Sequence, residues 1–170
     1  MPVGPSPKVR RWHLPDPEAT ERLGALLASA CPWDTPGPRL AYLSGQLGTG
    51  KTTLVAALLH ALGVEGPVRS PSYALLELYP LVQGLAVHAD CYRLGGAQDI
   101  EALGLRDYFS DRHLVLIEWP EQAGGALPQP DLALELTVEA GGRNCQGVAH
   151  TRAGARWLAG MGALEMSVLN

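Results

Sequence analysis

Residues 39–53, RLAYLSGQLGTGKTT, decide the fold, because a short apolar run leads directly into a glycine-rich loop that opens a helix. Residues 45–52 (GQLGTGKT) match the phosphate-binding pattern G-x-x-x-x-G-K-[ST]. A chain of this composition is expected to contain roughly 0.002 such matches by chance. The strand before the loop and the helix after it are the context that the motif requires, so the sequence predicts a nucleotide-binding P-loop.

The residues of this loop have distinct expected roles. Its glycines let successive backbone N–H groups turn inward around a phosphate, and the helix N-terminus adds its dipole. Lys51 is expected to reach the β- and γ-phosphates, and the hydroxyl group of Thr52 to bind Mg²⁺. Lys51 is one of only two lysines in the chain, which argues further against an accidental match.

The segments on either side of the loop alternate between strand and helix patterns. We expect an α/β fold: a P-loop NTPase-like sheet with a parallel core, added antiparallel hairpin strands and helices on both faces. The pattern predicts one domain over residues 1–170, with flexible tails at 1–7 and from about 162 to 170. The predicted strands are 8–14, 39–45, 73–80, 85–92, 113–119, 131–139 and 145–151, and the predicted helices are 16–31, 48–63, 97–109 and, more weakly, 155–166.

Composition and charge exclude several classes of protein. Hydrophobic residues make up 46% and charged residues 18% of the 170 residues, which is typical of a soluble globular domain. The net charge is −4 and the basic residues are scattered, so we expect no strong autonomous binding of nucleic acid. Three separated cysteines and the absence of an apolar leader or membrane-spanning run favour a cytoplasmic protein that does not contact the membrane.

Two carboxylates are candidates to complete a nucleotide site. Glu118 ends the apolar run 114–117, and Asp90 follows the run 86–89, so both are expected at strand ends near the loop. Hydrolysis needs Mg²⁺ held from a second side and a water molecule oriented at the γ-phosphate. Position alone leaves a second interpretation open for each residue, namely a solvated carboxylate at the end of a strand.

Three further features are open to two interpretations each. The segment 70–73 (SPSY) lies after the P-loop helix, where phosphate-sensing switch loops occur, but it also fits an ordinary Ser-Pro turn. His88 is either a core histidine or one that supports a nearby ligand residue. Trp119 is either an interface aromatic or a core aromatic.

The ordered set 45–53 (GQLGTGKTT), 70–73 (SPSY), 88–94 (HADCYRL) and 117–122 (IEWPEQ) resembles the TsaE (YjeE) family. These are bacterial P-loop ATPases required for the threonylcarbamoyladenosine modification of ANN-decoding tRNAs. The resemblance covers nearly the whole chain except both tails. The family pattern is S-P-T-[YF], so Ser72 keeps the hydroxyl group of the family threonine and lacks its methyl group.

The resemblance implies Mg²⁺ and ATP or ADP as cofactors and TsaB-like and TsaD-like proteins as partners, with tRNA reached only through that complex. It implies that Thr52 and Glu118 hold Mg²⁺, and that Asp90, Lys51 and Glu118 serve hydrolysis. The nucleotide-binding residues that it implies are Thr20, Gly45, Gln46, Leu47, Gly48, Thr49, Gly50, Lys51, Thr52, Thr53, Ser72 and Arg143.

Two other functions remain as alternatives to an ATPase whose activity depends on partners. A small-molecule kinase would need a substrate lid with several cationic side chains, and the sequence has no arginine cluster after the P-loop helix. A nucleotide-gated binding module would keep the P-loop and have little turnover of its own. A GTPase is disfavoured because the chain lacks the guanine-reading motif N-K-x-D.

Overall fold

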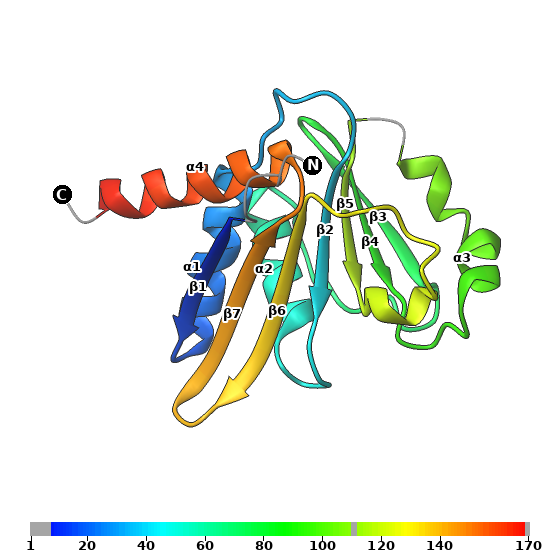
Figure 1. The fold of residues 1–170 in the computed structure, drawn as a ribbon, viewed down its shortest axis with the longest axis horizontal. Coiled ribbons are helices and arrows are strands. Elements are labelled where there is room, and N and C mark those ends of the chain that lie inside the picture. The colour runs from blue at the N-terminus through cyan, green and yellow to red at the C-terminus, as the bar shows by residue number, and fades with distance from the viewer. Residues whose placement is uncertain (1–7, 110–111, 169–170) are drawn as a thin grey trace, which may run out of the picture.

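One seven-stranded sheet, in the order β1-β7-β6-β2-β5-β4-β3, organises the chain (Figure 1). The computed structural model describes residues 8–109 and 112–168, and the predicted tail 1–7 lies outside them. The strands are β1 (Val9–Leu14), β2 (Arg39–Ser44), β3 (Leu76–Leu81), β4 (Gly84–Asp90), β5 (Leu114–Glu118), β6 (Leu132–Glu139) and β7 (Gly142–Ala149). The helices are α1 (Pro17–Ser29), α2 (Lys51–Ala61), α3 (Ala97–Leu103) and α4 (Arg152–Val168), with short 3-10 helices at Leu105–Tyr108 and Pro120–Ala123.

The centre of the sheet is parallel, as the sequence predicts. Strand β2 pairs in parallel with both β5 and β6, and β4 pairs in parallel with β5. The remaining pairs, β3 with β4, β6 with β7 and β1 with β7, are antiparallel. Because β2, β4 and β5 run in the same direction, the residues at their carboxyl ends lie at one edge of the sheet, next to the P-loop.

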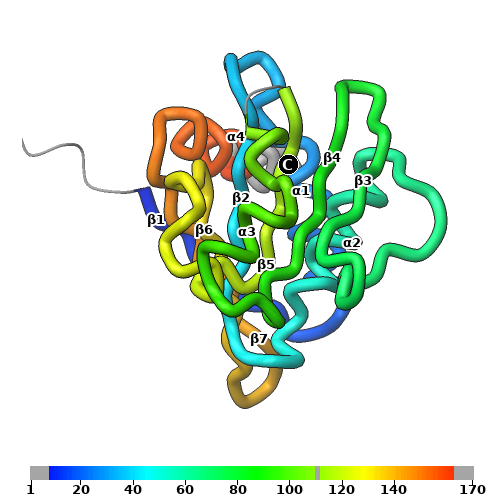
Figure 2. The backbone as a smooth tube through the Cα atoms, turned by 90° about the vertical axis from the view of Figure 1, so that its right-hand side faces the viewer, coloured from blue at the N-terminus to red at the C-terminus, as the bar shows by residue number. Residues whose placement is uncertain are grey.

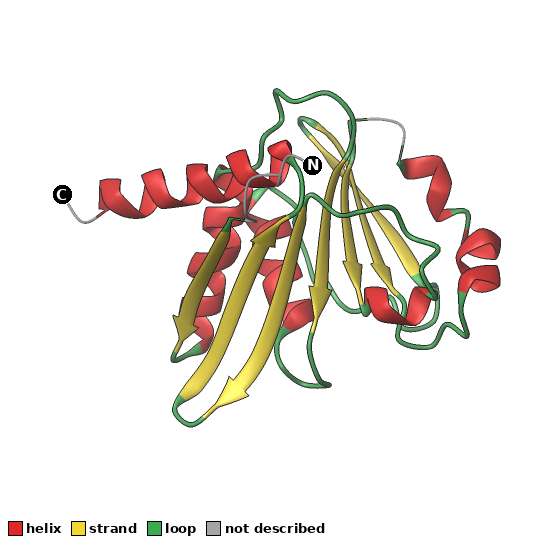
Figure 3. Ribbon diagram, viewed as in Figure 1, coloured by secondary structure: helices red, strands yellow, loops and turns green. Residues whose placement is uncertain are grey.

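Helices cover both faces of the sheet, which confirms the predicted fold class (Figure 3). On one face, Leu114 and Leu116 of β5 pack in a buried cluster with α1, α2 and α4. On the other face, Val115 and Ile117 pack with residues of α3 and the two 3-10 helices. This alternation follows from the two-residue period of a strand, and it directs the side chain of Glu118 to the same face as α2.

Helix α1 begins where the sequence predicts. The side chain of Asp16 accepts a hydrogen bond from the backbone N–H of Ala19 at 2.7 Å, and Pro17 occupies the first turn. A Cβ atom added at Gly24 would lie 2.4 Å from the Cβ atom of Ala57. The absence of a side chain at Gly24 therefore allows α1 to pack closely against α2.

Several predicted boundaries differ from the structure; strand β3, for example, is Leu76–Leu81 instead of 73–80. The segment 97–109 forms two short helices instead of one, because Gly104 adopts a φ of 69° and ends α3. Strand β7 begins at Gly142 instead of residue 145, so residues 140–141 alone form the turn from β6. Figures 1 and 2 show that this hairpin extends past the other strands. Its length places Arg143 on a strand beside the P-loop.

The C-terminal segment also differs from expectation. Helix α4 spans Arg152–Val168, so it begins before and ends after the helix predicted over 155–166. The flexible tail expected from about residue 162 stays a prediction, and residues 169–170 lie outside the described residues. The buried indole of Trp157 donates a hydrogen bond to the carbonyl oxygen of Leu27 at 2.8 Å, which attaches α4 to α1. Among the described residues, no helix has both the length and the apolar character needed to cross a membrane.

Candidate functional site

The P-loop joins the end of β2 to the first residue of α2, and its glycines have backbone conformations that other residues rarely adopt. Gly45 has a φ of 138° and Gly50 a φ of 101°. A Cβ atom at Gly45 would lie 2.3 Å from the carbonyl oxygen of Leu136 on β6. Glycine at this position therefore lets the loop pass directly over the neighbouring strand.

The ammonium group of Lys51 lies inside the curve of this loop. Its Nζ atom donates hydrogen bonds to the carbonyl oxygens of Gly45 at 2.7 Å and Gln46 at 2.9 Å. The same atom lies 4.0 Å from the centroid of the Trp119 ring, a cation–π contact. Burial lowers the pKa of Lys51, and the negative charge of Glu118 partly opposes this shift. A phosphate placed here would meet a cation that is already desolvated.

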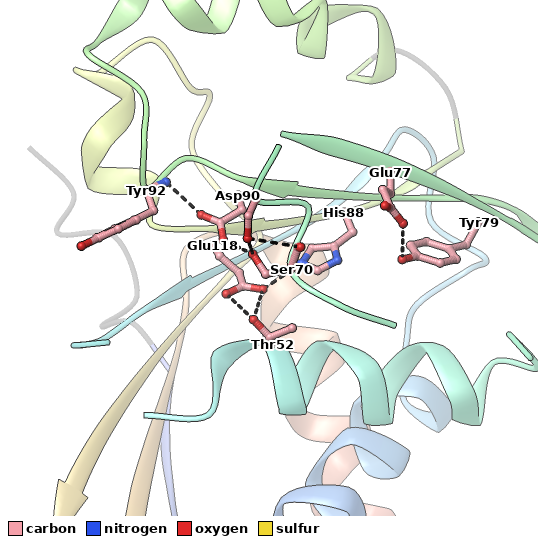
Figure 4. A network of polar contacts seen from close by, with 9 residues as sticks. Thr52, Ser70, Glu77, Tyr79, His88, Asp90, Tyr92 and Glu118 are labelled. Carbon is pink, nitrogen blue, oxygen red and sulfur yellow. Dashed lines mark hydrogen bonds and ion pairs between the residues drawn. The ribbon is translucent and has the colours of Figure 1, made fainter. Parts of the chain in front are cut away.

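Glu118 and Thr52 meet at the junction of β5 and α2 (Figure 4). The hydroxyl group of Thr52 lies 2.9 Å from Oε1 and 3.0 Å from Oε2 of the carboxylate. On its other side, Oε1 lies 2.8 Å from Nε2 of His88, which is fully buried. Only 2% of Glu118 is exposed to solvent. The carboxylate is therefore held by partners from two different elements.

Asp90 ends β4 beside Glu118, and the two residues are directly paired in the parallel register. One of its carboxylate oxygens accepts a hydrogen bond from the hydroxyl group of Ser70. The other accepts a hydrogen bond from the backbone N–H of Tyr92 at 2.9 Å. Both oxygens thus have a partner, and Asp90 connects β4 to the segment that precedes β3 (Figure 4).

These side chains surround one cavity of about 420 Å³, a size suited to a small-molecule ligand. Its wall combines the P-loop, the segment before β3, the carboxyl ends of β4 and β5, and the hairpin of β6 and β7. The lining residues are Leu47, Gly48, Gly50, Lys51, Thr52, Thr53, Ser70, Ser72, Leu75, Asp90, Tyr92, Arg93, Glu118, Trp119 and Arg143.

Arg143 is the contribution of the β6–β7 hairpin to this cavity. A Cβ atom at Gly50 would lie 3.5 Å from its Nε atom, so the guanidinium group lies against the P-loop. That Nε atom is buried and has no hydrogen-bond partner among the described residues. A buried donor without an acceptor is costly, and an anionic ligand in the cavity would provide one.

The structure also tests whether the residues fit a magnesium ion. Thr52 and Glu118 place a hydroxyl oxygen and a carboxylate oxygen side by side on the cavity wall, and both are hard oxygen donors. Among the described residues, no group of three or more His, Cys, Asp or Glu side chains could hold a metal by itself. Two protein ligands suit Mg²⁺, which keeps water molecules and binds substrate phosphates.

Most of the residues proposed from sequence for the site come together, although not all of them line the cavity. The P-loop residues that do not line the cavity are Gly45, Gln46 and Thr49. The carbonyl oxygen of Gln46 accepts hydrogen bonds from Lys51 and Thr49. Thr20 is buried in α1 and is not part of the cavity wall. Its predicted place near a nucleotide therefore stays a prediction.

Sequence reasoning missed three contacts of the site. It left His88 between two interpretations, although His88 and Asp90 are two residues apart on β4 and must share a face. It gave Trp119 no link to Lys51, which only the fold reveals. Within segment 70–73 it named Ser72, whereas the residue that contacts Asp90 is Ser70.

Comparisons with known proteins show which family this chain resembles. Residues 14–145 match the family described as "Threonylcarbamoyl adenosine biosynthesis protein TsaE". The TsaE protein of Haemophilus influenzae is 36% identical over 143 residues, which cover 84% of this chain and 90% of that protein. The TsaE protein of Bacillus subtilis is 30% identical over 150 residues, which cover 88% and 90%, respectively.

A solved structure supports the fold independently. The crystal structure of YdiB from Bacillus subtilis superimposes with a TM-score of 0.77 and covers 95% of this chain and 99% of that one. The sequence identity of this pair is 23%, so the likeness concerns the fold. The matching architecture is a mixed sheet with a parallel core and helices on both faces.

Proposed function

The chain belongs to the TsaE family of threonylcarbamoyladenosine biosynthesis, and we propose that it is a Mg²⁺-dependent ATPase that supports the enzyme complex modifying tRNA. In this proposal the partners are a TsaB-like and a TsaD-like protein, and tRNA is reached through them. The observation that carries the nucleotide site is the P-loop, with Lys51 inside its curve and a cavity in front of it.

The charges around the cavity support a ligand that carries phosphate groups, which in this proposal is a nucleoside triphosphate. Two positively charged side chains line the cavity, Lys51 from the first turn of α2 and Arg143 from β7. The first backbone N–H groups of α2 also lie at the loop, where a helix favours a negative charge. In this role Lys51 exchanges its carbonyl partners for phosphate oxygens. Arg143 gains the acceptor that its buried Nε atom lacks. Both exchanges replace a neutral or missing partner by a negative charge.

The magnesium ion in this proposal is held by Thr52 and Glu118. When bound, Mg²⁺ supplies positive charge that neutralises the phosphate oxygens during phosphoryl transfer. Asp90 lies next to Glu118 in the register of the sheet and lines the same cavity, so it is the residue proposed to orient the attacking water. Its carboxylate is fixed by Ser70 and by the backbone of Tyr92, which suits a group that must hold one orientation.

The proposed base specificity is for adenine, because the sequence has no N-K-x-D motif to read guanine. A competition titration with ATP, ADP and GTP in the presence of Mg²⁺ tests this. We expect GTP to bind more weakly than ATP. Equal or tighter binding of GTP would contradict the proposal.

The dependence on partners rests on the segment between α2 and β3. It contributes Ser70 and Ser72 to the cavity wall, while Tyr73 is 90% exposed and contacts Arg93 through its ring. One segment therefore touches the nucleotide cavity and the outer surface together. Such a segment can report the state of the nucleotide to a partner protein.

The decisive experiment mixes the purified chain with the TsaB-like and TsaD-like proteins under ATP, under ADP and without nucleotide. Size exclusion follows complex formation, and phosphate release follows turnover. Association that differs between the three states, with turnover that rises in the complex, supports the proposal. Association that is absent, or identical in all three states, would favour a small-molecule kinase. Nucleotide-dependent association without turnover would identify a nucleotide-gated module.

We also propose that the protein works in the cytoplasm. Cys31, Cys91 and Cys145 are all free and buried, and burial raises the pKa of each thiol to about 12. Thiols of this kind need no disulfide partner, which suits a reducing compartment. Fractionation of cells that express a tagged chain checks this location.

A further inference from the structure

We propose that His88 is a positioning residue that holds the carboxylate of Glu118 in its metal-binding orientation. The inference deepens the proposed function and rests on it, since it concerns the Mg²⁺ site formed by Thr52 and Glu118. His88 does not line the cavity, whereas Thr52 and Glu118 do. Its influence on a ligand must therefore pass through Glu118.

The contact between His88 and Glu118 is built by the sheet. His88 lies on β4 opposite Leu116 of β5, two residues before the pair formed by Asp90 and Glu118. Side chains two residues apart on a strand share a face, so the ring of His88 lies directly behind the carboxylate. Its Nε2 atom is 2.8 Å from Oε1 of Glu118, and 0% of the histidine is exposed (Figure 4).

The surroundings of the ring indicate which nitrogen carries the proton. An ionised carboxylate can only accept, so Nε2 must be the donor in this contact. Nδ1 is buried and has no hydrogen-bond partner among the described residues. A proton on Nδ1 would leave one N–H without an acceptor and turn the Nε2 lone pair toward the carboxylate. The arrangement with the proton on Nε2 avoids both costs.

The two oxygens of Glu118 are consequently unequal. Oε1 has two partners, His88 and Thr52, whereas within the described chain Oε2 has only the Thr52 hydroxyl group, whose single hydrogen the two oxygens share. Oε2 thus keeps acceptor capacity beside the Thr52 hydroxyl group, on the cavity wall. Loss of the His88 contact would release Oε1 and let the carboxylate rotate away from this orientation. Loss of an outer-shell partner of this kind typically costs about 10- to 100-fold in metal affinity.

The experiment compares His88→Phe with His88→Gln by titrating ADP in excess Mg²⁺ and again in EDTA. Phenylalanine keeps a planar ring without the donor, whereas the glutamine amide nitrogen can reach the place of Nε2. We expect His88→Phe to weaken Mg²⁺-supported ADP binding by about tenfold or more and binding in EDTA by less than about twofold. His88→Gln is expected to recover most of the loss.

The combination of the two conditions separates positioning from a merely structural role. His88→Phe with unchanged Mg²⁺ dependence would overturn the inference. So would an equal loss of ADP binding with and without Mg²⁺. If the unmodified protein binds no nucleotide in either condition, the proposed function fails instead.

A second measurement needs no variant and therefore still decides if His88→Phe does not fold. Proton–nitrogen correlation spectra of the unmodified protein report which ring nitrogen of His88 is protonated. A proton on Nε2, with a resonance that moves when Mg²⁺ and ADP are added together, supports the inference. A proton on Nδ1 alone, or a resonance that does not respond to Mg²⁺ and ADP, would overturn it.

Discussion

The hydroxyl group of Ser70 donates a hydrogen bond to the carboxylate of Asp90 and so joins the segment before β3 to the carboxyl end of β4. Both residues line the cavity in front of the P-loop. Asp90 is 8% exposed, so little water competes for this contact. The orientation of Asp90 is therefore coupled to the position of the segment that carries Ser72 and the exposed Tyr73.

Replacement of Ser70 by alanine is expected to lower ATP turnover by about tenfold, equivalent to about 1.4 kcal/mol in the barrier. The physical reason is that Asp90 loses the partner of one oxygen and samples other orientations. Phosphate release under saturating ATP measures the effect. Ser70→Thr is the matched control, because threonine keeps the hydroxyl group that donates to Asp90. An equal loss in both variants would contradict a role for this hydroxyl group.

The two carboxylates are expected to differ in what they contribute. Glu118→Gln and Asp90→Asn should each reduce hydrolysis by more than about tenfold, but only Glu118→Gln should raise the Mg²⁺ concentration required. Glu118 touches Thr52, whereas Asp90 touches Ser70 and the backbone of Tyr92. Magnesium titrations of both variants measure this difference. A shift in metal dependence for Asp90→Asn alone would reverse the two roles.

Arg143 is expected to bind the nucleotide through the geometry of its guanidinium group as well as its charge. Its buried Nε atom lacks a partner, and a lysine cannot place a donor at that point. Arg143→Lys should therefore weaken ATP binding nearly as much as Arg143→Ala, by about tenfold, which is about 1.4 kcal/mol. Isothermal titration calorimetry measures both affinities. Full recovery by lysine would mean that charge alone is needed.

The buried thiols predict a loss of stability in alkaline solution. Burial raises the pKa of Cys31, Cys91 and Cys145 to about 12, from the ordinary thiol value of 9.0. Between these values the unfolded chain releases thiol protons that the folded chain keeps. The free energy of unfolding therefore falls as pH rises, by about 1 kcal/mol per thiol and pH unit.

Urea unfolding at about pH 7 and about pH 10 measures this fall. Cys145 is fully buried, so Cys145→Ala removes one of the three contributions. The variant is less stable at both pH values because the substitution leaves a cavity. The difference between its free energies of unfolding at the two pH values, however, should be about 1 kcal/mol smaller than in the unmodified chain. If the free energy of unfolding falls between the two pH values by the same amount as in the unmodified chain, folding does not raise the pKa of Cys145.

Much of the fold can be predicted from short stretches of sequence, whereas the contacts within the site form between residues that are far apart along the chain. The strand and helix on either side of the P-loop, the Asp16 helix cap and the apolar strand β5 are short-range patterns, and the sequence predicts them. The break at Gly104 and the early start of β7 depend on the conformations of single residues within otherwise continuous patterns. Such boundaries are the least certain part of a prediction from sequence.

The contacts within the site depend on which strands become neighbours. Asp90 and Glu118 were candidates from their positions at strand ends, but their direct pairing requires β4 to lie beside β5. The contact of Lys51 with Trp119 requires β5 to lie beside β2, since Trp119 follows the end of β5. Sequence spacing contains no information on these distances, because the paired residues are far apart along the chain.

Lys51 tests the central claim most directly, because the P-loop assignment requires its ammonium group to meet the β- and γ-phosphates. The measurement is calorimetric titration of the unmodified chain and of Lys51→Ala with ATP in the presence of Mg²⁺. The account predicts measurable binding by the unmodified chain and a loss of at least about 100-fold, or about 2.7 kcal/mol, in Lys51→Ala. A folded Lys51→Ala variant that binds ATP as tightly as the unmodified chain would contradict the nucleotide site described above.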